Sequence, residues 1–238
     1  MLSDDERKRI VGLFEGLRVT DVNDGMDAVG LQDIGTMPGD IRPLWRDLNA
    51  FSHRIYGFAH TVRFLPTNKR AGRMPTDQFR KWVADWYTTL ANAPIAADIR
   101  ELDVIVLDGG EIPDCGFIGS YNSLEWIDAG AVGAVTNGGC RDTDEIIRQK
   151  VPVYSRHVRH GIRPGRVEVD GINIPVSVGG VMVRPGDFVA ADGDGVVIVP
   201  IELVEEVASY AREVQEADKK GRRGFFDHLG MPHDFTVS

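Results

Sequence analysis

The first thirty residues carry apolar positions at helical spacing. Apolar side chains recur three and four positions apart in residues 4–17 and again in residues 21–29, and this spacing predicts two amphipathic helices. Gly30 can end the second helix. Residues 31–54 are rich in Gly, Pro and Asp, so mainly loop is expected there.

A strand, a basic linker and a third helix follow. Residues 56–65 alternate enough to predict a strand, which Pro66 ends, and residues 76–90 place five apolar side chains on one helical face. The segment 67–97 looks like an insertion. Its aromatic face either packs on the core or a neighbouring subunit, or forms a lid over a pocket.

Strands and helices alternate in the next part of the chain, where short continuous apolar runs predict buried strands. We expect Leu124 and Ile127 to face inward from the helix between the first two strands. This alternation predicts an α/β fold, with helices against a sheet and a site at the carboxyl ends of the strands. The segments are, in order, strand 104–107, helix 119–129, strand 131–136, helix 143–149 and strand 151–158.

The pattern changes in residues 167–199, which consist of short apolar runs separated by Gly-containing turns. These runs predict a set of short strands. A final helix is expected from residue 201 to about residue 219, followed by a Gly-rich tail at about 220–238.

Composition narrows the class of protein. The 238 residues are 42% hydrophobic and carry a net charge of −9, which favours a globular protein and argues against nucleic-acid binding. The two cysteines exclude a disulfide framework and a Cys-rich zinc site. No apolar run approaches the ~20 residues that span a bilayer, and the first ten residues are highly charged, so we expect no membrane association and a cytoplasmic location.

The segment 138–145 (GGCRDTDE) is the most informative for chemistry. It places glycines, a guanidinium and a carboxylate between a buried strand and a helix start. Arg141 can hold a carboxylate through two parallel hydrogen bonds, and Asp142 can bind a hard divalent cation. The alternative is an Asp-capped helix with Arg141 in a structural ion pair.

A second helix start lies in residues 116–123. Its amide groups can bind another anionic oxygen of a ligand. Asn122 or Ser123 acting as a simple helix cap is the alternative, and the two interpretations are compatible.

Together these motifs resemble the RraA-like family, which includes 4-hydroxy-4-methyl-2-oxoglutarate and 4-carboxy-4-hydroxy-2-oxoadipate aldolases and regulators of ribonuclease E. The resemblance covers nearly all of the chain except the insertion and the tail. It implies one domain over residues 1–238 with a layered, swivelling β/β/α fold, assembled as a homotrimer or hexamer with sites between subunits. The segments that carry it are residues 20–24, 57–63, the Gly119 loop, 138–142, 152–156 and 184–200.

The resemblance also implies roles for individual residues. Asp142 would hold Mg²⁺ or Mn²⁺ with waters, and Arg141 would contact the pyruvyl part of a small anionic substrate. The main chain at the start of the helix would bind the substrate carboxylate, and a neighbouring subunit's C-terminal helix would supply a glutamate, for which Glu213 and Glu216 are candidates and Glu216 is preferred. The residues assigned to that main-chain site are Gly119, Ser120, Tyr121 and Asn122.

One position departs from the aldolase pattern. Active aldolases have an acidic residue twenty-one positions before the Arg, and here that position is Ser120. A hydroxyl cannot replace a carboxylate in moving protons at neutral pH. Four acidic residues are candidate substitutes for this carboxylate: Asp108, Glu111, Asp114 and Glu125.

Two functions follow from this pattern. The first is a divalent-metal-dependent lyase that acts on a 2-oxo acid or sugar-acid derivative through an enolate, by aldol cleavage, decarboxylation or a related elimination. The second is a non-catalytic regulator that binds a partner protein such as a ribonuclease.

Overall fold

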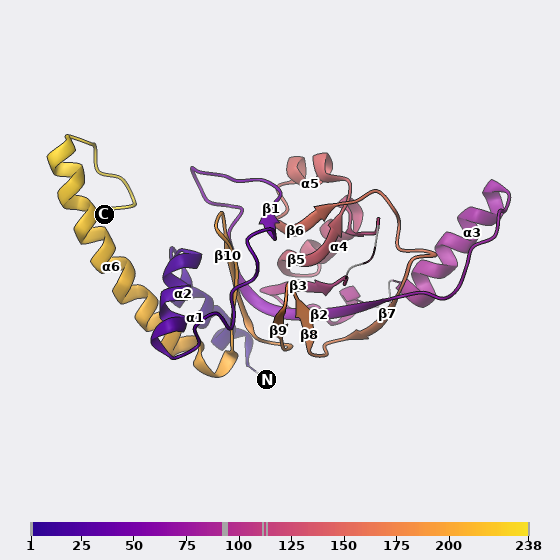
Figure 1. The fold of residues 1–238 in the computed structure, drawn as a ribbon, viewed down its shortest axis with the longest axis horizontal. Helices are drawn as coiled ribbons and strands as arrows, with labels where there is room; N and C mark the ends of the chain where they lie inside the picture. Colours follow the sequence, from indigo (N-terminus) through magenta and orange to yellow (C-terminus); the bar gives the residue numbers. More distant parts are fainter. Residues whose placement is uncertain (1, 92–94, 111, 113, 238) are drawn as a thin grey trace.

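A mixed β-sheet forms the centre of the molecule in the computed structural model, which describes residues 2–91, 95–110, 112 and 114–237 (Figure 1). Four parallel strands form its middle: β2 (Ile55–Pro66), β3 (Asp103–Asp108), β5 (Ala131–Cys140) and β6 (Val153–Val158). These strands lie in the order β6, β5, β3, β2. β3, β5 and β6 form where buried strands were predicted, and β2 forms where alternation predicted a strand.

The other strands extend this sheet or lie beside it. β1 (Arg42–Pro43) is antiparallel to β6, and β10 (Phe188–Asp192) is antiparallel to both β2 and β11 (Gly195–Val199). β4 (Gly116–Ile118) runs parallel to β5, and β7 (Val167–Ile172) pairs with β2. β8 (Val176–Val178) and β9 (Val181–Val183) form a separate hairpin. The mixed sheet with flanking helices confirms the predicted fold class.

Helices cover the sheet in two groups. α1 (Asp4–Phe14), α2 (Val19–Ala28) and the first part of α6 (Val204–Leu229) share a core with β10 and β11. There the rings of Phe14 and Phe188 lie 4.1 Å apart between centroids. Burying each such side chain contributes roughly 1.5–3 kcal/mol.

The second group, α4 (Ser120–Asp128) and α5 (Thr143–Gln149), packs against the parallel strands through Trp126 and Ile146. The expectation that Leu124 faces inward is wrong, because its side chain is 42% exposed. Trp126 takes the inward position, and Ile127 packs partly against the same core.

α6 ends ten residues later than predicted, because it continues through Lys220 to Leu229. Gly221 and Gly224 weaken a helix, but arginines in the same turns hold the chain that follows. Arg222 donates to the carbonyl of Thr236 at 3.1 Å, and Arg223 donates to the carbonyl of Val237 at 2.9 Å. The predicted tail therefore begins only after Gly230.

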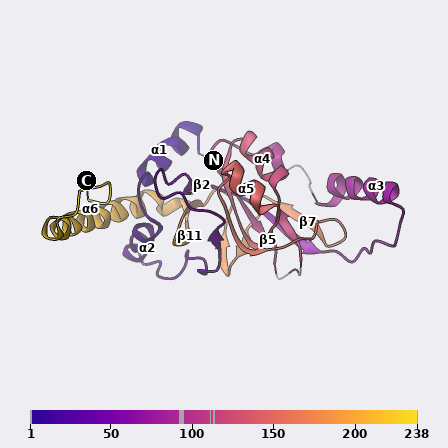
Figure 2. The same ribbon diagram turned by 90° about the horizontal axis from the view of Figure 1, so that it is seen from above.

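The insertion projects from the end of the molecule opposite to α6 (Figures 1 and 2). It contains α3 (Thr76–Trp86), a π-helical turn (Tyr87–Ala91) and a 3₁₀ turn (Ile95–Asp98). Trp86 is buried and donates its indole N–H to the carbonyl of Val167 at 3.0 Å, whereas Phe79 is 42% exposed. The aromatic face therefore packs on the core only at its C-terminal end.

None of the helices in the described part of the chain combines the length and the apolarity needed to cross a bilayer.

Candidate active site

A pocket of about 380 Å³ opens where β4 and β5 deliver the chain to the starts of α4 and α5. This is the edge of the sheet at which the alternation of strands and helices predicted a site. The residues that matter for its chemistry are Tyr87, Phe117, Asn122, Glu125, Arg141 and Asp142.

Arg141 and Asp142, the two residues that the sequence singled out, lie side by side at this pocket. The Arg141 Nε donates to Oδ1 of Asp142 at 3.2 Å, and about one third of each side chain is exposed. Asp142 has a φ of +56°, a left-handed conformation that Asp tolerates better than most residues. Its carboxylate makes no cap hydrogen bond to α5, so the Asp-capped helix is not what forms.

Two glycines make room for this pair. A Cβ on Gly116 would lie 2.8 Å from the Arg141 side chain, and a Cβ on Gly119 would lie 2.9 Å from Oδ2 of Asp142. Both distances are shorter than a real Cβ contact. Glycine at these two positions therefore allows the guanidinium and the carboxylate to lie against β4 and the start of α4.

Gly138 and Gly139 serve packing instead of ligand contact. We predicted a loop here, but β5 continues through Cys140. A Cβ on Gly138 would lie 2.6 Å from the Phe117 ring, and one on Gly139 would lie 2.3 Å from the Arg159 side chain. Glycine at these two positions therefore makes room for the Phe117 ring and the Arg159 side chain.

The start of α4 faces the same pocket. The Gly119 amide donates to Oδ1 of Asn122 at 2.7 Å, so the cap interpretation holds for Asn122. The Ser120 amide donates to Oδ2 of Asp142 at 3.3 Å. The first turn of a helix has amides without intrahelical partners, and Tyr121 and Asn122 of this turn line the pocket.

A buried arginine that the sequence did not single out closes the pocket. Arg163 is 2% exposed, donates to the carbonyl of Phe117 at 3.1 Å and donates to that of Ala91 at 2.9 Å. Burial lowers the pKa of its guanidinium. Because Ala91 belongs to the insertion, Arg163 fixes the end of the insertion beside the pocket, where Tyr87 forms part of the wall.

Of the four acidic substitutes for the residue replaced by Ser120, Glu125 lines this pocket. Asp108 instead accepts from the Asn137 side chain at 3.2 Å, and Asp114 accepts from the His160 amide at 2.9 Å. Glu111 is outside the described residues. Helical spacing was the available signal, because Glu125 lies about one turn after Tyr121.

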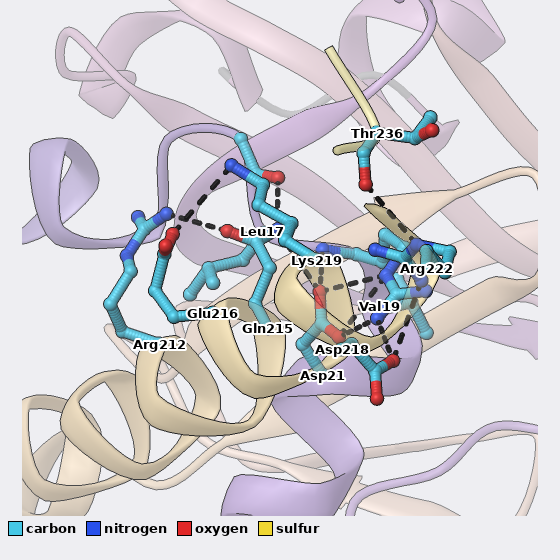
Figure 3. A network of polar contacts seen from close by, with 12 residues as sticks. Leu17, Val19, Asp21, Arg212, Gln215, Glu216, Asp218, Lys219, Arg222 and Thr236 are labelled. Atoms are coloured by element: carbon cyan, nitrogen blue, oxygen red, sulfur yellow. Dashed lines mark hydrogen bonds and ion pairs between the residues drawn. The ribbon is translucent and has the colours of Figure 1, made fainter. Parts of the chain in front are cut away.

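Within a single chain, Glu216 does not line the pocket. It is on α6, with a carboxylate oxygen 3.6 Å from the Lys219 ammonium (Figure 3). The neighbouring Gln215 fixes this part of the helix by donating to the carbonyl of Gly16 at 2.7 Å. Glu216 was predicted to act in a neighbouring subunit, and that remains a prediction.

A divalent cation would find one direct protein ligand here. The described residues contain no group of three or more His, Cys, Asp or Glu side chains suited to a metal. The contacts of Asp142 at 3.2 and 3.3 Å are long for charge-assisted hydrogen bonds and leave lone pairs on both oxygens. This donor set fits Mg²⁺, which keeps several waters and takes one or two carboxylates.

A family model described as Aldolase/RraA matches residues 19–198 of the chain. The chain belongs to the RraA-like family. The matched range contains the pocket and ends before α6, so the resemblance seen in the motifs is confirmed.

Individual relatives of this RraA-like protein are distant. "Protein DlpA" of Legionella pneumophila is 26% identical over 79% of this chain and 27% of its own length. "Putative 4-hydroxy-4-methyl-2-oxoglutarate aldolase" of Halalkalibacterium halodurans is 29% identical over 53% of this chain and 60% of its own length. The chain thus spans less than two thirds of either relative.

A solved structure shows the same fold. Streptomyces coelicolor RraAS2, described as an unusual member of the RNase ES inhibitor RraA protein family, has a TM-score of 0.69 at 21% identity. The match covers 93% of this chain and 98% of the other.

Proposed function

We propose that this protein is a divalent-metal-dependent carbon–carbon lyase that acts on a small 2-oxo acid. The observation that carries the proposal is the Arg141–Asp142 pair, held by Gly116 and Gly119 at one pocket with the start of α4. Relatives named as aldolases support the choice of chemistry.

Each group has a role in binding or cleaving a 2-oxo acid. Arg141 pairs with the oxygens of the pyruvyl part, and the first amides of α4 receive the carboxylate. Asp142 and water would hold Mg²⁺ or Mn²⁺, which supplies Lewis-acid polarisation of the ketone oxygen. Glu125 is the carboxylate placed to accept or return a proton at the pocket wall.

A ring-shaped homotrimer or hexamer belongs to the same proposal. Beyond Gln215, α6 has no buried side chain, and Phe225 and Leu229 are 69% and 66% exposed. Apolar side chains on a projecting helix favour contact with a second copy. Glu216 of the partner subunit would then complete the pocket.

Pyruvate release tests the proposal. We expect Mg²⁺-dependent pyruvate formation from oxaloacetate or 4-hydroxy-4-methyl-2-oxoglutarate, lost with a chelator. Arg141→Ala should raise KM about tenfold or more, because a charge-assisted pair to the substrate is lost. Arg148→Ala is the matched control, since its exposed side chain lies outside the pocket. No release above background from either substrate would overturn the proposal.

Ser120→Asp should increase aldol cleavage of 4-hydroxy-4-methyl-2-oxoglutarate by about tenfold or more. The change places a carboxylate beside Asp142 at the first turn of α4, where a helix favours negative charge. Ser120→Asn, which adds similar volume without charge, separates proton transfer from packing. Equal rates for the two variants would show that another group already supplies the proton.

Ser120 also favours a second function, a regulator without catalysis that binds a partner protein such as a ribonuclease. Mg²⁺ titration by calorimetry discriminates the two, because a protein-binding module needs no cation at Asp142. Absence of Mg²⁺ binding together with absence of pyruvate release would favour the regulator.

A further inference from the structure

The insertion forms a second cavity that adjoins the candidate active site. This cavity of about 570 Å³ is walled by Phe79 and Trp82 of α3, and its floor includes Gly165. Ile162 lines both this cavity and the active-site pocket. The two cavities therefore meet at Ile162, and the second one lies between α3 and the segment that follows β6.

The aromatic wall is fixed to the body of the molecule. The rings of Trp82 and Trp86 lie 5.2 Å apart, and Trp86 is buried and hydrogen-bonded to Val167. Gly165 has a φ of +75°, and a Cβ there would lie 3.0 Å from the Trp82 ring. Trp82 thus rests directly on the backbone of Gly165, which holds the wall in place without a bound partner.

Two arginines supply positive charge to this cavity. Arg166 donates to the carbonyl of Ile162 at 3.1 Å, and its nearest carboxylate oxygen, on Asp114, is 4.0 Å away, the limit of an ion pair. Arg70 is exposed and makes no ion pair with any residue that the structure describes. Both guanidiniums retain donors for an anion.

The insertion as a whole is cationic in an acidic protein. Residues 67–91 carry five cations against the two carboxylates of Asp77 and Asp85, giving +3, whereas the full chain carries −9. Such a local reversal of charge attracts anionic ligands toward the pocket. The five cations are Lys69, Arg70, Arg73, Arg80 and Lys81.

We infer that this cavity binds the distal end of the substrate, an acidic group carried on an apolar chain. The inference rests on the proposed function, with the 2-oxo acid end held at Arg141 and Asp142. The carbon chain passes Ile162 along Trp82 and Phe79, and Arg70 and Arg166 bind the terminal carboxylate. The new element is this subsite for the terminal carboxylate, formed by the insertion.

Binding of a homologous series tests this assignment. Calorimetry in Mg²⁺ would compare pyruvate with 2-oxoglutarate, 2-oxoadipate and 2-oxopimelate. We expect affinity to rise with chain length, with a total gain of roughly threefold to tenfold, because a partly exposed arginine pair contributes modestly. Arg70→Gln and Trp82→Leu should each remove most of that gain and leave pyruvate binding unchanged. Arg70 makes no ion pair within the described residues, so its replacement leaves the fold intact.

Arg73→Gln is the matched control, because it removes the same charge from the same linker outside both cavities. Equal, Arg141-dependent affinity across the series would overturn this inference and leave the proposed function standing. Absence of binding by every member, or binding that Arg141→Ala does not weaken, would overturn both. If Arg73→Gln removed as much of the affinity gain as Arg70→Gln, the gain would come from general charge attraction and not from a specific subsite.

Discussion

Asp142→Asn should lower Mg²⁺-dependent turnover at least about 100-fold, equivalent to ~2.7 kcal/mol of transition-state stabilisation. An amide oxygen is a much weaker ligand for a hard cation than a carboxylate, and Asp142 is the carboxylate beside Arg141 at the pocket. The free energy of unfolding should change by less than about 1 kcal/mol. Asn tolerates the left-handed backbone at this position, and the two hydrogen bonds lost or weakened are long.

Steady-state pyruvate release measures the loss of turnover, and urea unfolding measures the change in the free energy of unfolding. Mn²⁺ binding tests whether the metal ligand is lost. Asp144→Asn is the matched control, because Asp144 is exposed in the first turn of α5 and outside the pocket. Turnover within threefold of the wild type in Asp142→Asn would refute the metal assignment. An equal loss in the control would point to general electrostatics at the helix start.

The central strands were predictable because their burial leaves a direct signal. β3 and the first part of β5 are short, mainly apolar runs, and a parallel strand covered on both faces needs such a run. The positions of Arg141 and Asp142 were predictable for the same reason, since they follow a strand and precede a helix. Local pattern therefore located the pocket.

The rest depends on contacts between distant segments. A pair of adjacent glycines such as Gly138 and Gly139 is typical of a loop. Only the Phe117 ring and the Arg159 side chain packed over them show why they lie in β5. The sequence gives no sign that Arg163 is buried, because charged side chains are rarely fully buried. Its carbonyl partners lie 46 and 72 residues away in sequence, beyond any local pattern.

Tertiary contacts also determine where a helix ends and which of its side chains are buried. Leu124 and Trp126 are two residues apart and point to different sides of α4, so the register of the helix on the sheet decided which was buried. The extension of α6 past Lys219 depends on arginine contacts to residues 236 and 237. Intrinsic helix propensity alone predicted its end near the two glycines.

Arg163→Met should lower the free energy of unfolding by about 2–4 kcal/mol, the largest stability effect that we expect from one change at the pocket. Methionine can fill much of the space but donates no hydrogen bond. The carbonyls of Phe117 and Ala91 would then lose donors inside a buried region, and each unsatisfied group costs about 1–3 kcal/mol. The contact of the guanidinium with the Phe64 ring, 5.2 Å from its centroid, would also be lost.

Urea unfolding followed by tryptophan fluorescence measures this loss, and Arg148→Met on the exposed face of α5 is the control. Arg163 also joins the insertion to β4, so the variant should free residues 67–91 and speed their proteolysis. A destabilisation of less than about 1 kcal/mol with unchanged proteolysis would show that the two carbonyls find other donors. In that case Tyr87 would stay at the pocket wall without Arg163, and the insertion would be held mainly by Trp86.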